Sequence, residues 1–375
     1  MGHSYTPGLR VAADAIVRRE RRLPLRGEVL GAVGERVEPS QVVARTRLPG
    51  NVQSVNLAGR LGVDPARVGD YLVQPLGSEV RRGDIIARAK GLFGFVTNTV
   101  EAPADGVVES LSTVTGQLLL REPPIPVEVA GYLQGRIVEV LDGEGVIVEA
   151  RGALIQGIFG VGGETFGRLV CATATPDEPL EATDLRPEHR GAVVFGGRFI
   201  TVATVRHAVE LGIAAIVVGG FDDRDLREWL GRDLGVAITG HEDLGLTLVL
   251  TEGFGPISMA ARTWELLVSH EGRVASVSGA TQIRAGVQRP EIVVAHELGA
   301  SQPMAPAEDR GSLEIGSAVR VIREPEFGRI GRVVELPSEP RALETEALVR
   351  VLVVEFSDDH SQRTLPRTNI ERISG

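Results

Sequence analysis

The sequence predicts a mixed α/β protein with several domains: a β-rich N-terminal part, an α/β domain and a small β module at the end. Three observations predict this order. Up to about residue 150, short apolar stretches are separated by glycine turns, and few stretches show helical periodicity. From Gly191, uninterrupted apolar stretches alternate with amphipathic helical segments. From Ser312 onward, short strand patterns return.

The composition narrows the chemistry open to this protein. Its 375 residues include 40 basic ones, of which Lys90 is the single lysine. Schiff-base catalysis, a phosphate-loop lysine or a lysine-bound cofactor would therefore depend on Lys90. The net charge of −10 opposes non-specific binding to nucleic acid, and the single cysteine, Cys171, excludes a disulfide within the chain. The sequence shows no apolar run suited to a membrane span and no secretory signal, so we expect no membrane contact and a cytoplasmic location.

The β-rich part contains an internal repeat. Residues 34–45, "GERVEPSQVVAR", align without gaps on residues 77–88, "GSEVRRGDIIAR". Each copy predicts a glycine turn, a short strand centred on Val37 or Val80, a tight polar turn and then a buried strand.

The second copy belongs to a longer pattern that is typical of carrier domains. The run "VRRGDIIA" at residues 80–87 is followed by "EAPADGVVESL" at residues 101–111. The combination resembles the barrel-sandwich hybrid fold of biotinyl and lipoyl domains, which also serves as a non-carrier module in larger assemblies. On this resemblance, residues 26–172 form a barrel-sandwich hybrid β domain, preceded by an N-terminal arm at residues 1–25.

The resemblance also locates the residue that carrier domains modify. With Ala102 and Pro103 aligned, the position of the modified lysine falls on Phe95, and Lys90 lies five residues earlier. An aromatic side chain cannot form the amide bond. The resemblance therefore implies a non-carrier module with no cofactor, and in particular no attached biotin or lipoyl group.

Residues 173–190 are rich in proline and acidic residues and are expected to be a linker. Residues 191–297 then have the pattern of a Rossmann-like α/β domain, with strands "GAVVFGG", "IAAIVVGG" and "LTLVLTEGFG" separated by helices. In such domains ligands bind at the carboxyl ends of strands. The candidate ligand-binding residues lie at two of these ends and in a nearby segment: Gly219, Gly220, Asp222, Asp223, Gly253, Phe254, Gly255, Arg284 and Arg289.

Each group of candidates has two interpretations. Asp222 and Asp223 could bind Mg²⁺ or a ribose hydroxyl, or one of them simply caps the next helix. Pro256 is expected to start a helix whose free amides point back at the glycine loop, an arrangement that suits an anion. Arg284 and Arg289 would complete this anion site if they fold toward it. The alternative is a helix start beside two solvated arginines.

After a linker at residues 298–311, residues 312–375 form the last module. The segment "GSAVRVIREPEFGRIGRVVEL", at residues 316–336, resembles a KOW motif, which implies an SH3-like barrel. KOW modules of transcription-elongation and ribosomal proteins bind RNA or protein surfaces. Residues 311–375 contain nine arginines and eleven acidic residues, so the basic face of an RNA-binding module is not expected.

The sequence contains no metalloprotease, serine-hydrolase or phosphate-loop motif, and no histidine lies within four residues of another, so catalysis and a local metal site are not indicated. We therefore expect a non-catalytic binding or assembly protein. Its β modules would contact protein partners or further copies of the chain, and its α/β domain could bind a small anionic ligand. The alternatives are a nucleotide- or phosphometabolite-dependent enzyme or regulator, and RNA or transcription/translation-complex binding through the KOW-like module.

Overall fold

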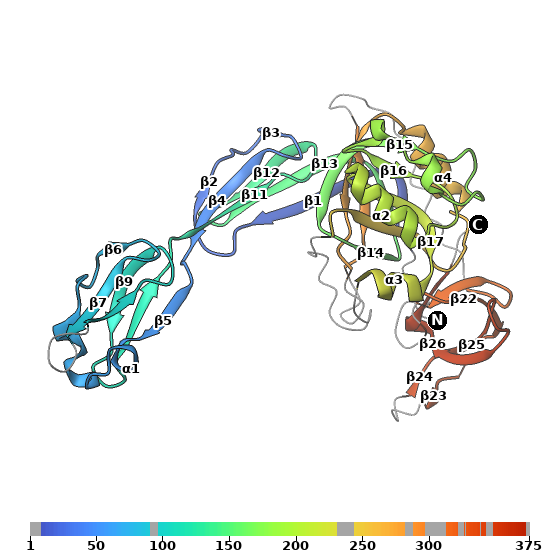
Figure 1. The fold of residues 1–375 in the computed structure, drawn as a ribbon. Coiled ribbons are helices and arrows are strands. Elements are labelled where there is room, and N and C mark those ends of the chain that lie inside the picture. The colour runs from blue at the N-terminus through green and yellow to red at the C-terminus, as the bar shows by residue number, and fades with distance from the viewer. Residues whose placement is uncertain are drawn as a thin grey trace.

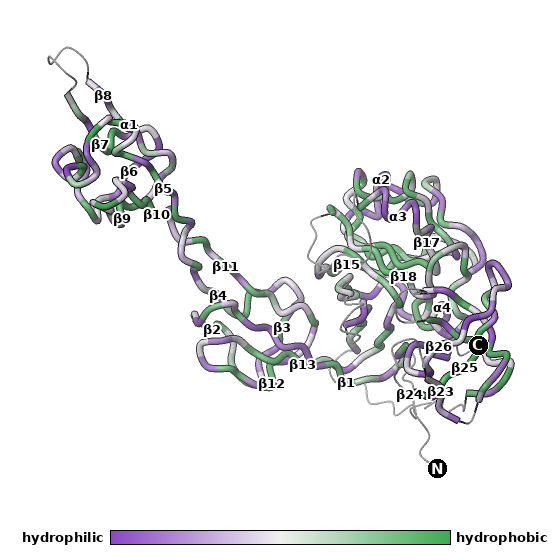
Figure 2. Tube along the Cα trace, turned by 90° about the horizontal axis from the view of Figure 1, so that it is seen from below, coloured by the Kyte–Doolittle hydropathy of each residue, from purple (hydrophilic) through white to green (hydrophobic). Residues whose placement is uncertain are grey.

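The computed structural model describes residues 9–90, 97–230, 244–281, 288–296, 313–321, 326, 328–337, 339–342 and 348–372. The protein is rich in β-structure, with several sheets and few helices. Its shape is elongated, because an arm of two β modules projects from a larger body (Figures 1 and 2). Among the described residues, no helix is both long and apolar enough to span a membrane.

One sheet of eleven strands runs through the body and into the arm. Its strands neighbour one another in the order β14 (Phe159–Val161), β18 (Thr247–Phe254), β17 (Ala215–Phe221), β16 (Val193–Phe195), β15 (Glu164–Cys171), β19 (Val274–Ser278), β20 (Glu291–Ala295), β13 (Gly145–Gln156), β12 (Gly135–Leu141) and β3 (Arg36–Val37). The eleventh strand, β1 (Val11–Arg22), pairs with β13. β15 to β18 are parallel, and the remaining pairs are antiparallel. The sheet is therefore mixed. Within residues 191–297, whose Rossmann-like pattern predicts parallel strands, β16 to β18 are parallel, whereas β19 and β20 are antiparallel to their neighbours.

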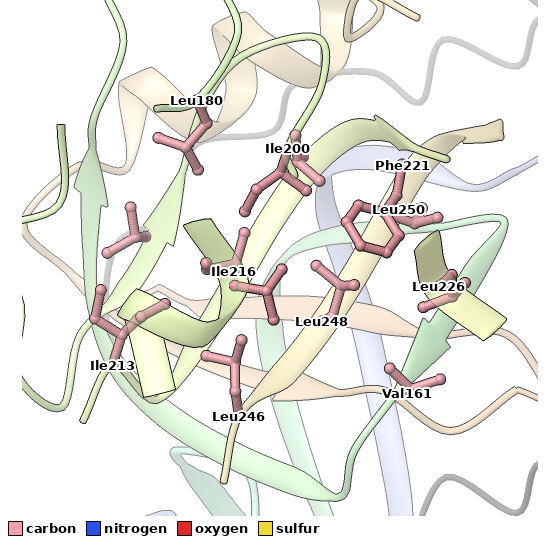
Figure 3. Close-up of a cluster of buried hydrophobic side chains, with 14 of the residues drawn as sticks. Val161, Leu180, Ile200, Ile213, Ile216, Phe221, Leu226, Leu246, Leu248 and Leu250 are labelled. Carbon is pink, nitrogen blue, oxygen red and sulfur yellow. The ribbon is translucent and has the colours of Figure 1, made fainter. Parts of the chain in front are cut away.

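The parallel strands form the core of the body. The connections between them carry α2 (Val202–Leu211) and α3 (Asp223–Leu230), which pack on one face of the sheet. Helix α4 (Ala261–Ser269) packs on the opposite face through Leu267. Figure 3 shows the buried cluster on the α2–α3 face, which includes Ile216, Phe221 and Leu248. Apolar side chains are thus buried on both faces, as the uninterrupted apolar strands predict.

The body begins earlier in the chain than expected. β14 and β15 lie in the segment assigned to the N-terminal β domain, yet β15 pairs in parallel with β16. The expected linker at residues 173–190 contains two short 3₁₀ helices, η3 (Ala182–Asp184) and η4 (Pro187–His189), and places Leu180 and Leu185 in the core. Proline and acidic residues mark an irregular surface segment, but they do not reveal that its leucines cover a sheet.

The arm consists of a distal module and a proximal module. The distal module, residues 51–121, contains β5 (Val52–Asn56), α1 (Leu57–Leu61), η1 (Pro65–Tyr71), β6 (Glu79–Val80), β7 (Ile85–Lys90), β8 (Thr97–Glu101), β9 (Gly106–Leu111) and β10 (Gln117–Arg121). The proximal module contains β1, β2 (Glu28–Val29), β3, β4 (Val42–Leu48), β11 (Ile125–Ala130), β12 and the first half of β13. Each module has its own buried core. The single β domain expected at residues 26–172 is therefore divided.

The distal module is inserted into a hairpin of the proximal one. β4 and β11 are antiparallel, their register ends at Leu48 and Ile125, and the chain between them forms the whole distal module. β7 and β8 form the equivalent pair inside the distal module. Both pairs have a register shift at the same place: it follows Ile85 in β7 and Val42 in β4, which are aligned in the sequence repeat.

The remaining strands of the two modules match in the same way. Val37 of β3 pairs with Gly135, and its repeat partner Val80 of β6 pairs with Gly106. A Cβ atom on either glycine would lie 2.3 Å from a carbonyl oxygen of the next strand, so both positions require glycine. β5 pairs with β10 as β1 pairs with β13. The sequence repeat therefore belongs to a larger structural repeat of two equivalent modules. One module is inserted into a hairpin of the other.

The C-terminal module packs against the body. Its five-stranded sheet has the order β26 (Gln362–Pro366), β25 (Val351–Phe356), β22 (Ile330–Glu335), β21 (Ala318–Val321) and β27 (Ile370–Arg372), and β23 (Arg341–Ala342) pairs with β24 (Leu348–Val349). A short 3₁₀ helix, η5 (Arg367–Asn369), precedes β27. The module has a separate apolar core that includes Val319, Val333 and Phe356.

Candidate functional site

The carboxyl ends of β16, β17 and β18 meet at one edge of the body, where the sequence predicts ligand binding. Gly219 and Gly220 lie near the end of β17. A Cβ atom on Gly219 would lie 2.1 Å from the carbonyl oxygen of Ile257, and one on Gly220 would lie 2.0 Å from that of Gly255. Both glycines are therefore required because the segment after β18 crosses directly over β17.

Asp222 acts as the cap of α3. Its Oδ1 accepts hydrogen bonds from the main-chain N–H groups of Arg224, at 2.9 Å, and Asp225, at 3.2 Å. The side chain of Asp223 lies outside the part of the structure that is described. The geometry at Asp222 matches the capping interpretation, in which a carboxylate satisfies free N–H groups and the positive end of the helix dipole.

We predict that Asp222→Ala lowers the free energy of unfolding by about 1 kcal/mol, because α3 loses its cap. Asp222→Asn keeps an oxygen acceptor for the cap. It should therefore lower the free energy of unfolding by only a few tenths of the loss expected for Asp222→Ala. Urea unfolding of both variants checks the prediction. Equal destabilisation by the two substitutions would contradict it, because the carboxylate charge and not the cap would then matter.

The helix after β18 starts later than predicted. α4 begins at Ala261 and not at Pro256. Between them, the main-chain N–H of Ile257 donates to the carbonyl of Gly255, and Met259 is buried against the sheet. The prediction is wrong because the burial of Met259 holds this segment across the strand ends in a non-helical path. The expected row of free helix amides beside Gly253 and Gly255 is therefore replaced by an irregular crossing.

The glycine loop itself packs against the C-terminal module. The ring of Phe254 lies 5.4 Å from that of Phe159, and a Cβ atom on Gly328 of the module would lie 2.5 Å from Cδ2 of Phe254. A Cβ atom on Gly253 would lie 2.8 Å from the carbonyl oxygen of Gly328. Gly255 has a φ of +104°, which favours glycine for its backbone alone. Phe254, a candidate ligand-binding residue, therefore faces another part of the same chain.

Four charged residues join the body to the C-terminal module. Arg320 of β21 donates from Nη2 to Glu252 of β18, at 2.8 Å, and from Nη1 to Glu371 of β27, at 2.9 Å. Arg289, just before β20, donates to the other oxygen of Glu371 at 2.8 Å. The second oxygen of Glu252 accepts the N–H of Ala260 at 3.0 Å. All four carboxylate oxygens are thus engaged by protein groups.

The network is balanced and buried. Two arginines face two glutamates, and the side chain of Arg320 is only 2% exposed. Charges withdrawn from water in this way are tolerated only when they are paired and hydrogen-bonded. Arg289, predicted to bind an anion, therefore has a carboxylate of its own chain as its partner. Arg284, the other predicted arginine, lies outside the described residues.

Sequence reasoning missed Glu252, Arg320, Glu371 and Gly328. One signal was available, because Arg320 lies between two valines and Glu252 follows an apolar strand, so both charges interrupt buried strand patterns. A charged residue inside a buried strand is rarely found without a partner of opposite charge. Nothing in the sequence shows which acid meets which arginine, because the paired residues are 51 and 68 positions apart.

The described residues contain no group of three or more His, Cys, Asp or Glu side chains arranged to hold a metal ion. No protein-family model matches this chain, and a search of curated proteins finds no match.

Proposed function

We propose that this protein is a non-catalytic assembly protein that uses its β modules to contact other proteins. The observation that carries the proposal is the arm, in which one copy of a repeated module is inserted into a hairpin of the other copy (Figure 1). The repeated module lengthens the arm by using the same fold a second time. Such reach is useful for contacting a partner at a distance from the body.

The joint between arm and body is built to hold its angle. β1 and β13 run as one antiparallel pair from the proximal module into the body, with partners from Val11↔Ile155 to Arg22↔Gly145. At the joint, Arg19 and the hydroxyl of Tyr132 both donate to buried Glu291. Burial raises the pKa of Tyr132 well above its usual value, so its hydroxyl stays protonated and remains a donor. A fixed arm presents its end in a defined direction, which favours binding because less motion is lost.

The resemblances of the modules support protein contacts over other functions. A barrel-sandwich hybrid module that lacks the modified lysine serves as a contact module and not as a carrier. In this chain, Phe95 occupies the position of that lysine. In the KOW-like module, Arg329 donates to Glu326 at 2.7 Å and to Asp358 at 2.6 Å, and it stacks on Phe356. An arginine neutralised by carboxylates contributes little to binding phosphates. RNA binding is therefore the weaker proposal for this module.

A small-molecule site in the α/β body is a further part of the proposal with less support. A ligand at the carboxyl ends of β16 to β18 would have to bind beside the C-terminal module, because Gly328 of this module lies against Phe254. We therefore place the main binding function on the arm. The nucleotide-dependent alternative would gain support from a thermal shift with a nucleotide that is lost in Gly255→Val.

The test compares the full chain with a variant that lacks the distal module. Replacing residues 49–124, which are the distal module and the short segments that join it to β4 and β11, by Asn-Gly closes these strands with a two-residue turn, since Leu48 already pairs with Ile125. We expect both proteins to fold and only the full chain to retain partner proteins from native lysate, as identified by mass spectrometry. Identical sets of retained proteins, or none with either protein, would contradict the proposed role of the arm.

A further inference from the structure

The edge strand of the distal module differs from its counterpart in the proximal module. β5 and β1 occupy equivalent places, since Val52 pairs with Arg121 as Arg18 pairs with Glu149. The equivalent segment of β1 is "RRERR" at residues 18–22, in which every residue is charged. β5 is "VQSVN" at residues 52–56 and has no charge. Charged residues are a common protection of sheet edges against pairing with another chain, so the proximal copy has this protection and the distal copy lacks it.

The backbone of β5 has hydrogen-bonding groups that point away from the sheet. The N–H of Glu122 donates to the carbonyl of Asn51, and the N–H of Leu57 donates to that of Gly116, so the odd-numbered residues of this segment face β10. In an antiparallel pair the alternate residues face the other way. The main-chain groups of Val52 and Ser54 therefore point outward. Within the described part of the chain, β5 pairs with β10 and with no other strand.

The distal module is also the electrically neutral part of an acidic chain. Residues 51–121 contain seven acidic and seven basic residues, whereas the whole chain has a net charge of −10. On the outer face beside the edge, Val52 is 44% exposed, and Val107, in the same cross-strand row, is 37% exposed. Two copies of this chain therefore repel each other least where their distal modules meet.

We propose that β5 pairs antiparallel with β5 of a second copy, which joins the two distal sheets and forms a two-fold symmetric dimer through the distal modules. In a two-fold pairing centred on Ser54, this serine faces the same serine of the other copy, and Val52 faces Asn56. β5 belongs to the distal module, which projects away from the body (Figure 1), so pairing through β5 keeps the acidic bodies apart. This inference deepens the proposed contact role of the arm by naming a second copy as one partner.

The test uses the full chain and a charge swap at the symmetry centre, with mass measured by light scattering after size exclusion. We expect the natural chain to be a dimer and Ser54→Lys and Ser54→Glu each to raise the dissociation constant at least about tenfold, because like charges would meet across the two-fold axis. An equimolar mixture of the two variants should form dimers again. A monomeric natural chain, or a mixture that stays monomeric, overturns the proposal.

A matched control distinguishes the effect of a charge at the β5 edge from the effect of a charge elsewhere on the distal module. Ser110 lies in the same cross-strand row as Ser54 but in β9, which has strands on both sides, so Ser110→Lys should leave the dimer intact. A second measurement needs no substitution: the amides of Val52 and Ser54 should be protected from hydrogen exchange at high protein concentration and lose protection on dilution. Protection that does not change with concentration overturns the pairing. A monomer that still retains other proteins from lysate would contradict only this inference, not the proposed function.

Discussion

Arg320→Ala is expected to release the C-terminal module from the body. The substitution leaves Glu252 and Glu371 facing each other without their shared cation, and both carboxylates are buried. Breaking a buried ion pair by removing one partner costs on the order of 3–5 kcal/mol, because an uncompensated charge stays inside the protein. Urea unfolding measures the loss of stability, and hydrogen exchange in β21 and β27 shows whether the module has come away.

The matched control for this prediction is Arg363→Ala. Arg363 also belongs to the C-terminal module, but it is exposed and lies 3.6 Å from Glu326, so its removal should cost at most about 1 kcal/mol. The double variant Arg320→Ala with Glu371→Ala should lose less stability than the sum of the two single variants, because each removes the other's partner. Strict additivity, or an Arg320→Ala variant as stable as the Arg363→Ala variant, would show that the network does not hold the module.

Gly50→Ala is expected to deform the neck of the arm. Two chain segments cross here, and a Cβ atom on Gly50 would lie 1.9 Å from the carbonyl oxygen of Glu122 and 2.5 Å from that of Pro123. Both obstacles are main chain, so the neck itself must shift. We expect a loss of about 3 kcal/mol, the upper end of the usual cost of overpacking, and a changed angle between the two modules. Small-angle X-ray scattering measures the change in shape, and thermal unfolding measures the stability.

Gly69→Ala provides the comparison for the neck variant. Gly69 lies in η1 of the distal module, where an added Cβ atom would meet only Cδ2 of Leu111, at an ordinary 3.8 Å. This variant should keep the scattering profile and the stability of the natural protein. If Gly50→Ala also kept both, the close crossing at the neck would have no mechanical role.

Several parts of the fold were predictable because they depend on neighbouring residues. In the repeat, Gly34 and Gly77 adopt φ values of +90° and +85°, which favour glycine, and the short strands after them end where the polar turns begin. The apolar strands of the body, with amphipathic helices between them, predict buried parallel strands for the same local reason. The capping role of Asp222 is likewise a matter of adjacent residues, and the sequence left it as one of two interpretations.

The candidate site was predicted less well because its environment comes from elsewhere in the chain. The sequence places Gly219, Gly220 and Gly253 at strand ends, which is where the structure has them. Their neighbours are residues 255–259 and the turn at Gly328, and no local pattern shows that these segments cover them. A glycine needed for close packing looks the same in sequence as a glycine that leaves room for a ligand.

By itself the sequence determined the β-rich character of the chain, its repeated turn-and-strand unit and the apolar strands of the body, because short-range backbone preferences and side-chain alternation decide these. Only the tertiary structure decided that one copy of the repeat lies inside a hairpin of the other, that residues 159–185 belong to the body, and that Arg289 pairs with Glu371. These facts depend on which strands and charges meet after folding. Such contacts join residues far apart in the chain, and their pairing is selected by packing and desolvation of the whole molecule.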